Sequence, residues 1–121
     1  ILRTQLYHCG HKSAMANGYT YEGQPVILSE YGGIAFADKQ QGEWGYGNAV
    51  KSEEEFLLRL QKITSAIYQV PYIVGFCYTQ VSDVEQEVNG LMRENRTYKV
   101  DPQKIRPIID PGASAENQTD H

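Results

Sequence analysis

Two uninterrupted apolar runs, separated by one amphipathic segment, dominate the middle of the sequence. The first extends from about Pro25 to Ser29 and the second from about Ile73 to Tyr78. Runs of this length without polar alternation are typical of strands that are buried on both faces, as in a parallel sheet covered by helices. Pro25 can begin such a strand but could not lie inside it. We therefore predict two parallel strands.

The segment between these runs has the pattern of a helix from about Glu53 to Gln69. Ser52 and Glu55 form a capping box at its start, and Pro71 follows its end. Apolar residues recur at spacings of four, three and four and define one face: Phe56, Leu60, Ile63 and Ile67. This helix is the expected crossover that brings the second strand parallel to the first.

The C-terminal part contains one more helix signal and then a polar tail. Asp101 is a candidate N-cap, Pro102 suits the first helical position, and the helix is expected from Gln103 to Ile109. Residues 111–121 have no apolar anchor, which predicts a disordered tail. With 121 residues, the chain is expected to hold one domain at most, over residues 1–110.

Glu30 is the first candidate for chemistry, because it follows the first apolar run directly. Barrel and open α/β folds place their functional groups at the carboxyl ends of strands. Gly32 and Gly33 would let the backbone turn and leave room for a ligand beside the carboxylate. The competing interpretation is that Glu30 only accepts hydrogen bonds from loop amides, which is the commoner role for an unselected glutamate.

A long loop from Ile34 to Lys51 follows, with Trp44 among several glycines. Loops of this length are uncommon unless they are functional or disordered. Trp44 could stack on the apolar face of a sugar ring or could pack the loop onto the body of the protein, and the sequence favours neither.

Composition excludes several classes of partner. Eleven basic residues against fifteen acidic ones, without a basic run, argue against nucleic acid. No apolar run is long enough to cross a membrane. His8 and His11 lack a third ligand nearby, so no metal site is predicted. Cys9 and Cys77 are too few for a disulfide framework.

Two motifs resemble glycoside hydrolase family 2, the β-galactosidase and β-glucuronidase family. Pro25–Gly33 is similar to the strand that carries the family's nucleophile, with its Ser-Glu-Tyr-Gly sequence, and Gly75–Leu91 is similar to the next and last barrel strand. The resemblance implies a fragment of a (β/α)8 TIM barrel, acting on a carbohydrate substrate without a cofactor or metal. It also implies that Glu30 is the nucleophile of a retaining glycosidase, with the sugar surrounded by Tyr31, Trp44, Tyr78 and Asp83.

A complete barrel needs roughly 250 residues, so the chain would supply only its last two strands. The family's acid/base glutamate lies on an earlier strand, and the isolated chain is therefore expected to be inactive. Its uncovered strand edges predict self-association. The family's tryptophan near the end of the last strand is replaced by Tyr78 and Thr79, which leaves the sugar and its linkage open.

The alternative is a non-catalytic carbohydrate-binding or scaffold piece. Binding modules of that kind are usually antiparallel sandwiches with short strands at regular spacing, whereas the pattern here is strand, helix, strand. The sequence assigns no compartment: the cytoplasm, the periplasm and secretion all stay open.

Overall fold

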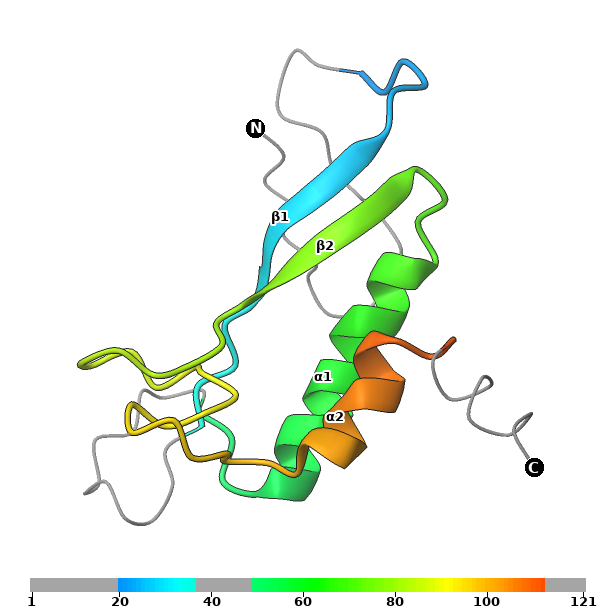
Figure 1. Cartoon of the computed structure of the whole chain (residues 1–121). Helices are drawn as coiled ribbons and strands as arrows, with labels where there is room; N and C mark the ends of the chain where they lie inside the picture. The colour runs from blue at the N-terminus through cyan, green and yellow to red at the C-terminus, as the bar shows by residue number, and fades with distance from the viewer. Residues whose placement is uncertain (1–19, 37–48, 113–121) are drawn as a thin grey trace.

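The computed structural model describes residues 20–36 and 49–112. The order of elements is β1 (Val26–Gly32), α1 (Glu53–Tyr68), β2 (Ile73–Thr79) and α2 (Pro102–Ile109). The described part is thus a small α/β unit with two strands and two helices. Figure 1 shows the strands side by side and both helices adjacent to one another. The predicted disordered tail and the loop tip with Trp44 lie outside the described residues, except for Pro111 and Gly112.

The two strands pair in parallel, as the sequence predicts. β1 extends further than the predicted end at Ser29, because pairing resumes beyond Glu30: Tyr31 faces Tyr78 and Gly32 faces Thr79. The register is irregular between Leu28 and Tyr31. Glu30 therefore lies inside β1, near its carboxyl end, and not after the strand.

Helix α1 confirms the predicted crossover. The Ser52 hydroxyl accepts a hydrogen bond from the Glu55 backbone N–H over 3.1 Å, which satisfies one of the unpaired donors at the helix start. One face of the helix is fully buried, and Thr64 belongs to it. The apolar pattern predicts Ile63 for that face instead, but Ile63 is only half-buried. The reason is a polar contact: the Thr64 hydroxyl lies 3.3 Å from that of Tyr31 on β1.

The main core is formed by the two helices together with the two ends of the loop between β1 and α1. Phe56 and Leu60 of α1 pack with Ile105 of α2 in one cluster. That cluster also contains Ile34, Phe36 and Val50, which the sequence assigned to the long loop. Phe36 and Val50 are joined by an isolated parallel bridge, so the two ends of that loop belong to the folded body. A second cluster, of Leu28, Tyr31 and Ile67, joins the sheet to α1.

The other face of the sheet is open in the described part of the chain. Ile27 is 63% exposed and Val74 is 65% exposed. Within the described residues, the predicted burial of both strand faces is therefore wrong, because α1 packs on one face and no described element covers the other.

The connection from β2 to α2 folds back on itself. Isolated bridges join Ser82 to Met92 and Met92 to Tyr98, and the Lys99 backbone N–H donates to the Leu91 carbonyl over 3.1 Å. These contacts bring Lys99 close to Asp83, sixteen residues earlier. At α2, Asp101 is the N-cap as predicted, and its carboxylate accepts from the Gln103 backbone N–H over 2.9 Å.

Candidate functional site

A pocket of about 350 Å³ opens at the carboxyl ends of β1 and β2. This volume is in the lower range of small-ligand sites. Its walls come from the end of β1, the middle of α1, the end of β2 and the loop that follows β2. The lining residues are Glu30, Tyr31, Gly32, Gly33, Ile63, Thr79 and Asn89.

Glu30 provides the carboxylate of this pocket. Its side chain is exposed, and no hydrogen bond or ion pair joins it to another side chain or to a loop amide in the described residues. The competing interpretation, in which Glu30 accepts hydrogen bonds from loop amides, is therefore not supported by any contact in this part of the chain. An exposed carboxylate in a pocket at a strand end is available to a ligand.

Gly32 lets the backbone pass close to Tyr78. Its φ is +102°, and a Cβ atom there would lie 2.4 Å from Cε2 of the Tyr78 ring. Gly33 also has a positive φ, of +61°. Side chains at these positions would be strained or would displace the aromatic ring. Gly32 and Gly33 thus allow the backbone conformation that the sequence predicted for a turn, and Gly32 also makes room for the Tyr78 ring.

Tyr31 and Tyr78 support the pocket from the helix side. Their rings meet edge to face, with centroids 5.5 Å apart. Burial raises the pKa of both phenols above the ordinary value, although the Thr64 hydroxyl partly opposes the shift at Tyr31. The Tyr78 hydroxyl, which stays protonated, donates to the Asn89 carbonyl over 3.5 Å. Tyr31 lines the pocket, whereas Tyr78 does not. Tyr78 lies next to two residues that do, Gly32 and Asn89.

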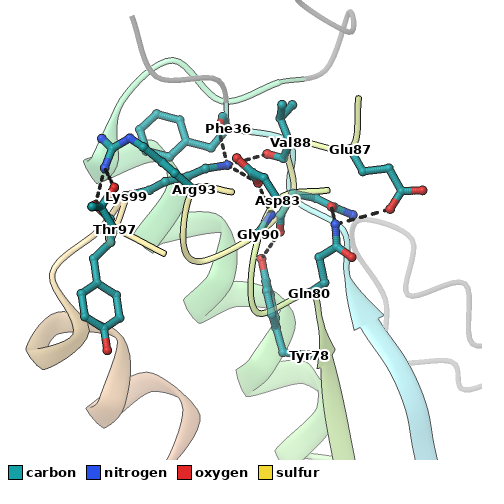
Figure 2. A network of polar contacts seen from close by, with 12 residues as sticks. Phe36, Tyr78, Gln80, Asp83, Glu87, Val88, Gly90, Arg93, Thr97 and Lys99 are labelled. Carbon is teal, nitrogen blue, oxygen red and sulfur yellow. Dashed lines mark hydrogen bonds and ion pairs between the residues drawn. The ribbon is translucent and has the colours of Figure 1, made fainter. Parts of the chain in front are cut away.

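Asp83, which the resemblance places near the sugar, does not line the pocket. It is 3% exposed, and its Oδ1 atom lies 2.6 Å from Nζ of Lys99. The same oxygen accepts a hydrogen bond from the Gly90 backbone N–H over 2.9 Å. Figure 2 shows this pair at the centre of a polar network in the loop after β2. Trp44, the remaining predicted sugar contact, lies outside the described residues.

Two further residues, Thr79 and Asn89, line the pocket from the end of β2 and from the loop that follows it. Asn89 is ten residues beyond Thr79, and it reaches the pocket because the loop folds back. The Gln80 side-chain amide donates to Asn89 Oδ1 over 2.8 Å. This bond leaves the Asn89 NH₂ group as a donor for a ligand. Lys99 was missed altogether, since no periodic pattern marks it.

Within residues 20–36 and 49–112, no cluster of three or more His, Cys, Asp or Glu side chains could hold a metal ion. No helix in the same ranges is long and apolar enough to cross a membrane.

Gly90 lies very close to the backbone of its own loop, so a substitution at this position tests the loop's geometry. A Cβ atom at Gly90 would lie 2.3 Å from the Asp83 backbone nitrogen and 2.4 Å from the Ser82 carbonyl carbon. Backbone atoms cannot rotate away, so we expect Gly90→Ala to lower the free energy of unfolding by about 1–3 kcal/mol. Urea unfolding measures this change.

Gly75→Ala is the matched control, because the added methyl group would meet only Ile27 Cγ1 at 3.8 Å. We expect it to change the free energy of unfolding by less than about 0.5 kcal/mol. Equal stability of the two variants would mean that the loop does not pack against Gly90 as described.

No family model matches the chain, and no curated protein matches it significantly. What the fold and the site define is therefore a small α/β unit whose two parallel strands end at a pocket with one exposed carboxylate.

Proposed function

We propose that the chain is the C-terminal part of the TIM-barrel catalytic domain of a retaining β-glycosidase of the glycoside hydrolase family 2 type, with Glu30 as its nucleophile. One observation carries this proposal: the exposed Glu30 carboxylate lies in a pocket at the carboxyl end of a parallel strand, next to the end of the following strand. In TIM barrels this edge of the sheet carries the catalytic groups.

The chemistry fits a carboxylate in this position. In a retaining glycosidase, one carboxylate attacks the anomeric carbon and forms a glycosyl ester, which water later cleaves. A second carboxylic acid, roughly 5–5.5 Å away, protonates the leaving group. The proposal assigns that acid to an earlier strand of the parent enzyme. Thr79 and the Asn89 amide, which also line the pocket, would offer hydrogen bonds to sugar hydroxyl groups.

Trapping of the intermediate tests the proposal. The parent protein is incubated with a panel of 2-deoxy-2-fluoro β-glycosyl fluorides, and the labelled peptide is located by mass spectrometry. The fluorine slows hydrolysis of the ester, so a label on Glu30 is expected. A label on any other residue would remove Glu30 as nucleophile. The alternative of a non-catalytic carbohydrate-binding or scaffold piece requires that no residue is labelled.

The open face of the sheet leads to a prediction for the 121 residues alone. Large apolar patches seldom stay exposed on a monomer, and Ile27 and Val74 lie on a face that the rest of a barrel would cover. Among residues 20–36 and 49–112, both strands are also edge strands, with backbone groups on their outer sides that no described strand pairs. We expect the isolated chain to self-associate, and light scattering that finds a compact monomer would contradict this.

We also expect the isolated chain to hydrolyse no unactivated glycoside, because the acid/base is missing.

A further inference from the structure

We propose that Asp83 and Lys99 are positioning residues, whose buried ion pair holds Asn89 in the wall of the pocket that Glu30 also lines. The role of Asn89 in ligand binding rests on the proposed function, whereas the mechanical part of the inference stands on the contacts alone. Neither residue lines the pocket, so both act through the loop that they hold.

Lys99 joins the loops that follow the two strands. Its side chain is 1% exposed, and its ammonium group donates to three acceptors. These are Asp83 Oδ1 at 2.6 Å, the Phe36 carbonyl at 2.9 Å and the Val88 carbonyl at 2.9 Å. Phe36 follows β1, and Val88 belongs to the loop after β2. An ammonium group has three N–H donors, so it can donate to all three of these acceptors at once.

The pair fixes the backbone on both sides of Asn89. Lys99 holds the Val88 carbonyl, and Asp83 Oδ1 accepts from the Gly90 N–H. The contacts shown in Figure 2 therefore bracket Asn89 in the sequence. Gln80 then fixes the side chain of Asn89 by its bond to Oδ1. The Asn89 amide is thus held at its backbone and at its side chain, which is the preorganisation that a binding group needs.

Stability alone does not account for a pair of this kind. Burying two charges is costly, and apolar replacements of similar volume are often as stable. In addition, Asp83 Oδ2 is buried without a hydrogen-bond partner in the described part of the chain. An apolar pair would avoid both costs but could not bond the Phe36 and Val88 carbonyls or the Gly90 N–H. The directional bonds to the loop backbone are what the charged pair provides.

The double substitution Asp83→Leu/Lys99→Met separates positioning from stability. We expect the 121-residue chain to keep its fold, so that the amides of α1 exchange with solvent at their original rates. The Phe36 and Leu91 amides, whose acceptors are the Val88 and Gln80 carbonyls, should exchange at least about tenfold faster. Neither acceptor is altered by the substitutions, so faster exchange reports movement of the loop. Lys104→Met, at the exposed pair with Glu53, is the control and should leave these amides unchanged.

Unchanged exchange at Phe36 and Leu91 in the double variant overturns the inference. If the double variant does not fold, Asp83→Asn takes its place, because it keeps an oxygen for Gly90 and loses only the charge that pairs with Lys99. The same two amides decide the outcome.

A kinetic arm tests the consequence for the ligand. The probe is the 4-nitrophenyl β-glycoside that the unmodified parent protein hydrolyses fastest. Asn89→Ala and the double variant should each raise KM about tenfold, with a smaller change in kcat. Combining them should raise KM no further, because the pair acts through Asn89. Additive effects overturn the positioning role. Failure of the proposed function shows differently, as absence of hydrolysis or a label elsewhere than Glu30, while the exchange result is unaffected.

Discussion

On the proposed function, replacing Glu30 with glutamine in the parent protein is expected to lower kcat by about 10⁴-fold or more, while sugar binding is largely retained. The amide has nearly the shape of the carboxylate, so the pocket keeps its walls. It has no negative charge and cannot form the glycosyl ester, so the first chemical step is lost. Steady-state hydrolysis and equilibrium binding of the same glycoside measure the two effects separately.

Glu94→Gln is the matched control for this substitution. Glu94 is also an exposed glutamate of the described chain, but it does not line the pocket. Its variant should retain full activity. If Glu30→Gln turned over substrate at a rate near that of Glu94→Gln, Glu30 would have no part in the mechanism.

The elements of the fold could be predicted because each has a local cause. Ser52 and Glu55 specify the start of α1 by a capping bond between two residues only three positions apart in the sequence. The two apolar runs and the crossover helix between them then require parallel strands. The end of β1 was missed because the register irregularity after Leu28 depends on the partner strand. A pattern within one strand contains no information on how its neighbour is spaced.

The site was predictable to a smaller extent, for the same physical reason. Glu30 was found because it follows an apolar run directly, and the structure places it at the pocket. Asp83 was placed near the sugar by the resemblance alone, and it is buried against Lys99. That outcome depends on the return path of the loop, which is set by the close approach of Gly90 to the backbone of residues 82 and 83. Tertiary contacts of this kind have no signature at fixed spacing.

The buried pair also leads to the largest expected effect on stability. Lys99→Met removes the positive charge and leaves the Asp83 carboxylate buried, since Asp83 is only 3% exposed. Breaking a buried pair by removing one partner typically costs about 3–5 kcal/mol, because the remaining charge is uncompensated. We expect a loss of free energy of unfolding of that size in urea titrations of the 121-residue chain.

Lys104→Met makes the same chemical change at an ion pair with the same N–O distance. Lys104 Nζ lies 2.6 Å from Glu53 Oε1, as Lys99 Nζ does from Asp83 Oδ1, but the Lys104 side chain is 56% exposed. Water screens the exposed pair and solvates the glutamate that remains, so little change in stability is expected. Adding Asp83→Leu to Lys99→Met should recover most of the lost stability, because no charge then remains buried. Equal losses in the two single variants, or no recovery in the double variant, would show that the Asp83 charge is not held in a desolvated site.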